Sequence, residues 1–328
     1  MTDADPTPTV QEAGAALQRL EAEIRKAYIG QPMVVRGVLL GLLARGNLLL
    51  EGTPGLGKTL LVRVLAQALH LRFRRIQFTP DLMPADITGG PALVQLPGGG
   101  TELRFRPGPV FAHIVLADEV NRGTPKTQSA LLEAMQEQSV TVAGESHALP
   151  APFIVLATQN PIEMEGTYPL PEAQLDRFLF KLDVPFPDAA TLQRIGLETT
   201  GSRDPQVDAV MTRAELLSIQ ALVREIVVAP HIAEQAAKLV LATHPEQPGA
   251  PEPVRRFVRY GASPRAMQAL LLAGRAHALL EGRERVSTDD LAAIARPVLG
   301  HRIFLRFEAE LEGVQQSDVV DAVLAALG

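Results

Sequence analysis

The sequence predicts an α/β protein, in which a parallel sheet flanked by helices is followed by a smaller C-terminal all-helical domain. Short apolar runs typical of buried strands alternate with helical patterns as far as residue 187, which is the pattern of a parallel sheet covered on both faces. A glycine-rich loop lies between the first such strand and the helix after it. Beyond residue 187 the sequence is rich in Ala and Leu, with helical periodicity and few strand signals.

Two helices are predicted ahead of the first strand. Apolar residues recur at helical spacing over 10–26, with charged residues on the other face. A second helix is predicted over 32–45, because this stretch opens with proline and is followed by glycine. NLLLE at 47–51 then predicts a short buried strand, and a helix over 58–69 follows the glycine-rich loop.

Strands and helices continue to alternate through the next hundred residues. LRFRRIQFT alternates like a strand, whereas HIVLADE and FIVLATQN are apolar runs typical of buried strands. Glycines between β-rich runs predict two hairpins, which turn at 98–100 and at Gly144. The predicted elements are a strand at 71–79, a hairpin at 92–106, a strand at 113–119, a helix at 126–136, a hairpin at 140–149 and strands at 153–160 and 178–186.

These patterns divide the chain into three predicted parts. Residues 1–14 open with an acidic stretch rich in Pro and Thr and are expected to form a flexible N-terminal tail. Residues 15–187 are predicted to form the α/β core, and residues 188–328 the helical domain. Within the helical domain, QPGAPEPV at 247–254 is predicted to be a loop.

Composition excludes several classes of protein. The 328 residues include no cysteine, which excludes a disulfide framework, a thiolate nucleophile and a Cys-ligated metal site. The formal net charge of −6 argues against a dedicated nucleic-acid coat protein. The N-terminus lacks the basic start and apolar run of a secretory signal, and Arg36 and Arg45 interrupt the most apolar stretch. We therefore expect a cytoplasmic protein that does not insert into a membrane.

GTPGLGKT at 52–59 matches the phosphate-loop pattern G-x-x-x-x-G-K-[ST] in full. Its glycines allow successive backbone N–H groups to surround a phosphate, and Lys58 is expected to reach the β- and γ-phosphates. The hydroxyl of Thr59 is expected to coordinate Mg²⁺, so the predicted cofactors are ATP and Mg²⁺. The residues predicted to bind the nucleotide here are Gly52, Thr53, Pro54, Gly55, Leu56, Gly57, Lys58, Thr59 and Leu60.

Polar residues also end the next two buried strands. In IVLADE, Asp118 is predicted to act as a partner of Mg²⁺ in its outer coordination sphere. Glu119 points differently and is the predicted group that orients and deprotonates the attacking water. Asn160 ends the following strand, where it is a candidate for contacting the γ-phosphate or the water. The residues alone equally allow a turn-forming asparagine before Pro161.

Further short stretches complete a recognisable pattern. They are IGQ (29–31), GTPGLGKT (52–59), FTPDLMPADITG (78–89), FRPGPVF (105–111), VLADEVNR (115–122), LLEAMQE (131–137), ATQNP (157–161), GTYPLPEAQLDRF (166–178) and SPRA (263–266). In order and spacing they resemble the MoxR group of AAA+ ATPases, from about Tyr28 to the C-terminus. The segments at 115–122 and 166–178 are the most specific.

The resemblance implies an AAA+ core with a helical lid, and assembly into a ring, usually of six subunits, with ATP between neighbours. It places Ile29 and Gln31 near the adenine, and assigns Asn160 as sensor 1 and Arg265, on the lid, as sensor 2. The two hairpins match insertions that usually face the pore or the upper surface of the ring.

The resemblance also assigns Arg177, at the end of LPEAQLDRF, as an arginine finger donated to the ATP of the neighbouring subunit. A planar fork of donors suits the charge that spreads over the γ-phosphoryl oxygens in the transition state. The residues alone leave open a surface pair with Asp176 or a helix cap. Arg122 is a further candidate for the subunit interface.

The implied function is an ATP-driven motor that remodels or matures client proteins in a chaperone-like role. This role includes metal-cofactor loading, with a separate partner that carries a von Willebrand factor A domain. The alternatives are a nucleic-acid motor, a magnesium-chelatase-like motor subunit and a nucleotide-gated scaffold. Arginine and phenylalanine interleave at 72–75 and 103–106, which suits nucleic acid but is also typical of amphipathic strands. No nucleic-acid partner is expected, and the seven histidines lack metal-ligand spacing.

Overall fold

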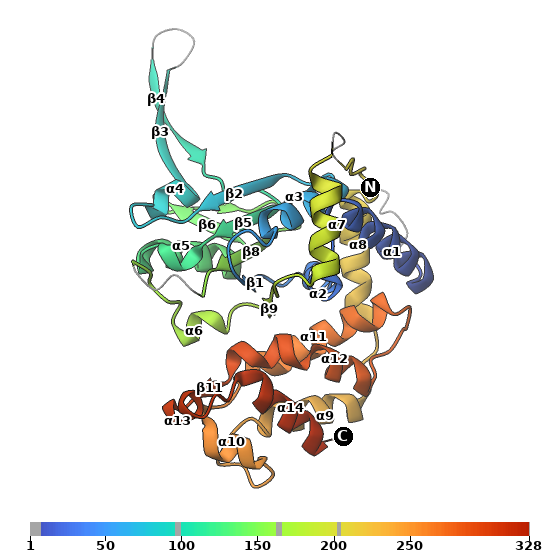
Figure 1. Ribbon diagram of the computed structural model, residues 1–328. Coiled ribbons are helices and arrows are strands. Elements are labelled where there is room, and N and C mark those ends of the chain that lie inside the picture. The colour runs from blue at the N-terminus through green and yellow to red at the C-terminus, as the bar shows by residue number, and fades with distance from the viewer. Residues whose placement is uncertain (1–7, 96–99, 162–165, 202–204, 328) are drawn as a thin grey trace.

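The computed structural model describes residues 8–95, 100–161, 166–201 and 205–327. Figure 1 shows a layered unit of sheet and helices, with a group of C-terminal helices below it in this view. A long hairpin projects from the layered unit on the side away from those helices. The confirmed fold class is therefore a helix-flanked sheet accompanied by a helical C-terminal part.

The core sheet has five parallel strands in the order β2-β5-β8-β1-β9. Successive side chains of a strand point to opposite faces, so Leu48 and Leu50 lie in one hydrophobic cluster and Leu49 in another. Both faces of the sheet are buried, which explains why the central strands are continuous apolar runs. The strands are β1 (Leu48–Glu51), β2 (Phe73–Gln77), β5 (Ile114–Asp118), β8 (Ile154–Gln159) and β9 (Phe180–Asp183).

Helices α1, α2 and α3 contribute to the hydrophobic cluster on one face, and α5 to the cluster on the other. Helix α1 begins at Val10, where the Thr9 hydroxyl accepts a bond from the Glu12 backbone N–H at 3.3 Å. Residues 10–14, assigned to the tail from the sequence, are therefore helical. The helices of this part are α1 (Val10–Ala27), α2 (Pro32–Leu43), α3 (Lys58–Ala68), α4 (Pro84–Thr88), η1 (Val120–Arg122), α5 (Pro125–Glu137), α6 (Glu172–Leu175) and α7 (Ala189–Thr199).

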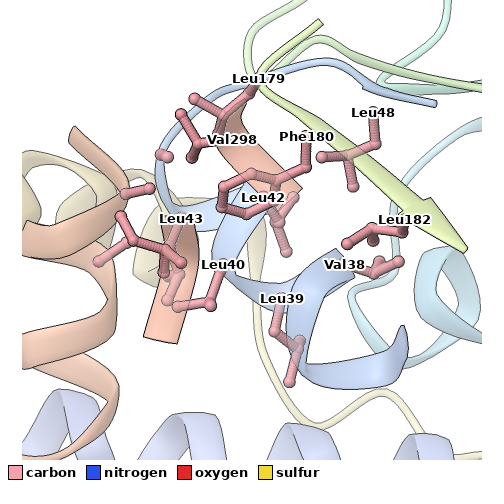
Figure 2. Packing of buried hydrophobic residues seen from close by; sticks show 14 of the residues in the cluster. Val38, Leu39, Leu40, Leu42, Leu43, Leu48, Leu179, Phe180, Leu182 and Val298 are labelled. Carbon is pink, nitrogen blue, oxygen red and sulfur yellow. The ribbon is translucent and has the colours of Figure 1, made fainter. Parts of the chain in front are cut away.

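Helix α2 lies close against the sheet because two glycines face it. A Cβ on Gly41 would lie 2.4 Å from the Leu48 side chain, and one on Gly37 would lie 2.7 Å from Leu182. Figure 2 shows apolar side chains of α2 gathered with those of β1 and β9 and with Val298 of α12 (Thr288–Leu299). The same hydrophobic cluster thus continues from the sheet into the C-terminal helices.

Two antiparallel hairpins extend the core. They are β3–β4 (Gly89–Gln95 and Thr101–Pro107) and β6–β7 (Ser139–Val142 and Glu145–Ala148). The second turns at Ala143 and Gly144, with φ values of 51° and 87°, which confirms its predicted position. The turn predicted at 98–100 in the first hairpin lies mostly outside the described residues.

The C-terminal part is mainly helical, as predicted, but also contains one small antiparallel strand pair. The predicted loop at 247–254 is wrong for its last three residues, because α10 begins at Glu252 after Pro251. Across the described residues, no helix combines the length and apolarity needed to cross a membrane. The elements are α8 (Arg213–Glu225), α9 (Pro230–Leu241), α10 (Glu252–Phe257), β10 (Val258–Tyr260), α11 (Pro264–Leu280), α12, η2 (Gly300–Arg302), β11 (Phe304–Leu305), α13 (Phe307–Leu311) and α14 (Gln316–Leu327).

A buried carboxylate, Asp290, ties the first turn of α12 to its neighbours. It accepts bonds from Arg283 Nη1 at 2.7 Å, from the Ser287 backbone N–H at 2.7 Å and from His277 Nδ1 at 2.6 Å. Burial alone would raise the pKa of Asp290, but these bonds outweigh it and lower the pKa to about 2. The charged carboxylate is therefore part of the stable folded state.

Replacing Asp290 with asparagine is expected to lower the free energy of unfolding by about 2–4 kcal/mol at neutral pH, because Arg283 loses its ionic partner. The folded-state pKa lies below the ordinary value of 3.8, so the contribution is present above that value. It is lost as the pH falls from about 4 towards 2. Thermal unfolding across this pH range measures both effects.

Asp289 provides the matched control, since it is an exposed acid in the same helical turn. Asp289→Asn is expected to change stability by less than about 0.5 kcal/mol. Equal unfolding temperatures for the two variants would contradict a stabilising role for the Asp290 contacts.

Candidate nucleotide site

The phosphate loop connects the carboxyl end of β1 to the first turn of α3, as the sequence predicts. Gly55 and Gly57 have φ values of 85° and 76°, which side chains rarely adopt. A Cβ on Gly52 would lie 2.8 Å from the Val184 carbonyl oxygen. Glycine is therefore required at the start of the loop for close approach, and at the other two positions for backbone conformation.

Lys58, the first residue of α3, points its ammonium back into this loop. The ammonium donates to the carbonyl oxygen of Thr53 at 3.1 Å and also to that of Gly52. Burial lowers the pKa of Lys58, and the charges of Asp118, Glu119 and Glu51 oppose that shift. The lysine and the two acids predicted from the sequence thus lie within electrostatic reach of one another.

Asp118 is buried at the carboxyl end of β5. Its Oδ2 accepts from Arg75 Nε at 2.9 Å and Nη2 at 2.6 Å, and its Oδ1 accepts from the Thr158 hydroxyl at 2.6 Å. β2 and β8, which carry these two partners, flank β5 in the sheet. These bonds hold the carboxylate in place and set the Arg75 guanidinium beside it.

Glu119 has a strained backbone, with φ at 55° in the left-handed region that glycine favours. Its carboxylate accepts from Gln77 Nε2 at 2.8 Å and from Arg122 Nη1 at 3.0 Å. Its backbone N–H donates to the Thr158 hydroxyl at 2.8 Å. Two neighbouring residues therefore fix the direction of the side chain, and Thr158 fixes the backbone.

Asn160, directly after β8, and Thr59, in the first turn of α3, lie at the same carboxyl edge of the sheet. Asn160 is buried, whereas Thr59 is partly exposed. Leu56 and Leu60 pack against the main hydrophobic cluster, which secures the loop and the helix. The parallel strand order places all of these groups at the edge where ligands of such sheets bind.

The segment before α2 closes another side of this site. The hydroxyl of Tyr28 donates to Gln31 Oε1 at 2.5 Å, and Gln31 Nε2 donates to the Pro185 carbonyl at 2.7 Å. A Cβ on Gly57 would lie 3.2 Å from the Tyr28 ring, so this segment touches the phosphate loop. Burial raises the pKa of Tyr28 to about 12, so the phenol stays protonated. Ile29, also predicted near the base, lies between Tyr28 and Gln31 and is partly exposed.

The residues at this edge fit a magnesium nucleotide. Mg²⁺ is usually held by one or two protein oxygen ligands together with substrate phosphates and waters. Thr59 supplies a hydroxyl as a ligand, and Asp118 supplies a carboxylate for the outer coordination sphere. The N-terminus of α3 and the ammonium of Lys58 provide the positive charge that phosphates need. Among the described residues, no cluster of three His, Cys, Asp or Glu side chains could hold a metal ion by itself.

Arg177 and Arg265 lie at the opposite edge of the sheet. Arg177 precedes β9, whose first residue pairs with the first residue of β1. Both arginines line a cavity of about 270 Å³ together with Asn47, which precedes β1. The phosphate loop instead follows the last residue of β1, and four strand residues span about 13 Å. The structure therefore separates these two predicted residues from the other site residues of the same chain.

The guanidinium groups of the two arginines remain accessible to solvent despite their contacts. Arg177 is exposed and donates only weakly, from Nη1 to the Leu132 carbonyl at 3.4 Å. Arg265 Nη1 lies 3.6 Å from Asp176 Oδ2, with 47% of its side chain exposed. Arg45, Arg224 and Arg302 line the same cavity. Five arginines and one acid, Asp176, line this cavity, so positive charge is in excess there and suits an anionic group.

Sequence reasoning missed four residues of the site, namely Tyr28, Arg75, Gln77 and Thr158. Gln77 could have been predicted as a site residue from the sequence, because it lies near the end of an alternating strand just as Asp118 and Asn160 lie at the ends of theirs. Arg75 lies on an exposed strand face, as the sequence predicts, but its guanidinium also forms an ion pair with Asp118. Arg122, a candidate for a subunit interface, contacts Glu119 within its own chain, and its place at an interface stays a prediction. Strand order brings Arg75, Gln77 and Thr158 beside the acids that end β5.

Comparison with known proteins agrees with this architecture. The model of the ATPase family associated with various cellular activities (AAA) matches residues 47–180, and the AAA lid domain model matches residues 250–323. A crystal structure of a candidate ATPase from Cytophaga hutchinsonii superposes with a TM-score of 0.90 at 37% identity. It covers 97% of this chain and 96% of that one.

Curated relatives are similar over nearly the whole chain. Chaperone MoxR1 of Mycobacterium tuberculosis is 41% identical, over 94% of this chain and 81% of its own length. Protein MoxR of Methylorubrum extorquens is 32% identical, over 94% of this chain and 93% of its own. With the phosphate loop, the helix-flanked sheet and the lid all in place, the chain belongs to the MoxR family of AAA ATPases.

Proposed function

We propose that the chain hydrolyses ATP at sites shared between neighbouring subunits of a ring, and uses this energy to remodel client proteins. One observation carries the proposal. The phosphate loop and the paired acids lie at one edge of the sheet, and the exposed Arg177 lies at the other. Each edge is half of a hydrolytic site, so the halves meet only when two copies pack edge to edge.

The proposed roles follow from chemistry and position. The loop N–H groups and Lys58 bind the phosphates, and Thr59 and Asp118 hold Mg²⁺, which neutralises charge on the phosphate oxygens when it is bound. Glu119 orients the water and accepts its proton, and Asn160 helps to position that water. Arg177 and Arg265 of the next subunit meet the γ-phosphate, where donors stabilise the charge of the transition state.

The base and ribose of the nucleotide are proposed to lie among three segments. Ile29 and Gln31 form one side, the phosphate loop forms the second, and the chain after β9 forms the third. The bond between Gln31 and the Pro185 carbonyl joins the first and third segments. These contacts bind the substrate equally in the ground and transition states, so they govern affinity more than rate.

The β3–β4 hairpin is proposed to contact clients. Leu93 and Leu103 face each other across the strands and are 74% and 64% exposed. Exposed apolar pairs on a projecting hairpin suit transient contact with unfolded or partly folded chains. The chaperone role named for MoxR1 of Mycobacterium tuberculosis supports this reading. We further propose that the ring has six subunits, that it takes part in metal-cofactor loading, and that a separate protein with a von Willebrand factor A domain is its partner.

Phosphate release from ATP by the purified oligomer tests the hydrolysis. Lys58→Ala is expected to lower the rate by about 10²- to 10³-fold, because a phosphate-stabilising charge is lost. Lys126→Ala, at an exposed lysine on α5, is the matched control and should keep the wild-type rate. Equal rates in wild type and Lys58→Ala would contradict the proposed site.

The same assay separates the alternatives. DNA or RNA is expected to leave the rate unchanged, whereas strong, salt-sensitive stimulation would instead favour a nucleic-acid motor. For a remodelling enzyme, we expect the oligomer to bind an added unfolded protein and to hydrolyse ATP faster in its presence.

A further inference from the structure

The segment that carries Arg177 is anchored on both sides of an exposed side chain. Asp176 is partly buried, Phe178 is fully buried and Leu179 is 7% exposed. Arg177 between them is exposed and, among the residues that the structure describes, makes only the weak bond to α5 described above. The position of its guanidinium therefore depends on what holds the backbone of residues 176–179.

One guanidinium from the C-terminal helical part holds that backbone. Arg302, at the end of η2, is 3% exposed. Nε donates to Asp176 Oδ1 at 2.9 Å, and Nη2 to the carbonyls of Asp176 at 3.2 Å and Phe178 at 2.5 Å. Nη1 donates to the carbonyls of Leu179 at 3.1 Å and Val298 at 2.5 Å. All five N–H donors of an arginine are used, and four of the bonds reach residues 176–179.

Two neighbours of Arg302 support the same segment. The Ser263 hydroxyl lies 2.8 Å from Asp176 Oδ2, and His301 Nε2 lies 3.0 Å from the Phe178 carbonyl. Burial lowers the pKa of His301 well below its usual range, so the ring is neutral and its Nε2–H donates to that carbonyl. Side chains from the N-cap of α11 and from η2 thus contact residues 176–179 directly.

Fold stability alone does not explain a guanidinium at this place. A buried ion pair is often no more stabilising than apolar residues of the same volume, because both charges must leave water. Burial lowers the pKa of Arg302 to about 10, opposed by the charge of Asp176, which reflects this cost. The arginine instead fixes one backbone geometry, since only its planar fork can satisfy five acceptors at once.

We propose that Arg302 is a positioning residue for Arg177, and that through it the helical lid sets where the guanidinium meets the nucleotide of the next subunit. The proposal rests on the proposed function. Any tilt of the lid moves η2, and the segment that carries Arg177 moves with it. Nucleotide-dependent lid motion in one subunit then changes hydrolysis in its neighbour.

Arg302→Met tests this role. We expect the turnover number to fall about 10²-fold, the cost of misplacing a reacting group by about 1 Å. Nucleotide affinity should stay within about twofold, because the phosphate loop is at the other edge. Arg302→Lys, with three donors instead of five, should lose less. Arg296→Met is the matched control, since it breaks only the exposed pair of α12 with Asp321.

Recovery of ATP hydrolysis in mixed rings separates a positioning role from a merely structural one. An Arg302→Met subunit keeps its own phosphate loop, but its Arg177 is misplaced for the nucleotide of the neighbouring subunit. Mixed with Lys58→Ala, which donates a normal finger, it should recover activity. Mixed with Arg177→Ala, it should not, because both variants lack the same half of the site.

The outcomes are distinct. If Arg177→Ala and Lys58→Ala recover activity together but Arg302→Met and Lys58→Ala do not, the positioning role is overturned. If Arg177→Ala and Lys58→Ala themselves fail to recover in rings shown to be mixed, the shared site of the proposed function fails. Should Arg302→Met not fold, Arg302→Lys decides, and a wild-type rate from it would overturn the inference.

Discussion

Replacing Arg177 with alanine is expected to lower ATP hydrolysis by the oligomer about 10³- to 10⁵-fold, the range known for arginine fingers. The guanidinium lies at the edge of the sheet opposite its own phosphate loop, so its loss should leave nucleotide binding by the same chain unchanged. Phosphate release and nucleotide affinity, measured on the same preparation, check both halves of this prediction.

Mixing two inactive variants tests whether Arg177 acts on the nucleotide of a neighbouring subunit. Arg177→Ala subunits bind ATP but cannot assist a neighbour, and Lys58→Ala subunits assist but bind poorly. Mixed rings of the two inactive variants should therefore recover part of the activity. Arg194→Ala, which removes an exposed arginine paired with Glu198 on α7, should keep the wild-type rate. Full activity of dilute, verified monomers would contradict a site completed by a neighbour.

The parts of the fold that sequence predicts best are those with strong local signals. Buried strands are recognisable as continuous apolar runs, such as residues 114–117. The phosphate loop needs glycines at Gly55 and Gly57 because both have positive φ. Helix α1 carries its own capping box. In each case the physical cause lies within a few residues of the chain, so the pattern alone suffices.

Other features depend on contacts between distant segments. The pairing of β10 with β11 joins residues 258–260 to 304–305, and neither segment has a strand pattern long enough to detect. Arg302 is one of many arginines in the sequence, and four of its five bonds exist only because η2 packs against the segment that precedes β9. The separation of Arg177 from Lys58 likewise follows from strand direction, which single motifs do not report.

Glu119→Gln is expected to lower hydrolysis by about 10²- to 10⁴-fold while ATP still binds, because glutamine keeps the shape but cannot accept the proton of the water. The contacts of Glu119 make this substitution a clean one. Gln77 and Arg122 both donate to the same carboxylate oxygen, and an amide oxygen at that position can accept both bonds. The strained backbone is fixed by the bond from its N–H to Thr158, which the change does not touch.

This substitution also separates a motor from a nucleotide-gated scaffold. A scaffold would show the same negligible phosphate release in wild type and Glu119→Gln, whereas a motor loses most of its turnover in the variant. Glu198→Gln, an exposed acid on α7, controls for the loss of one negative charge and should keep the wild-type rate. Nucleotide trapped on Glu119→Gln rings should persist far longer than on wild type, since release of phosphate is what ends the bound state. Rapid hydrolysis by Glu119→Gln would mean that another group accepts the proton, and the role assigned to this strained residue would then be wrong.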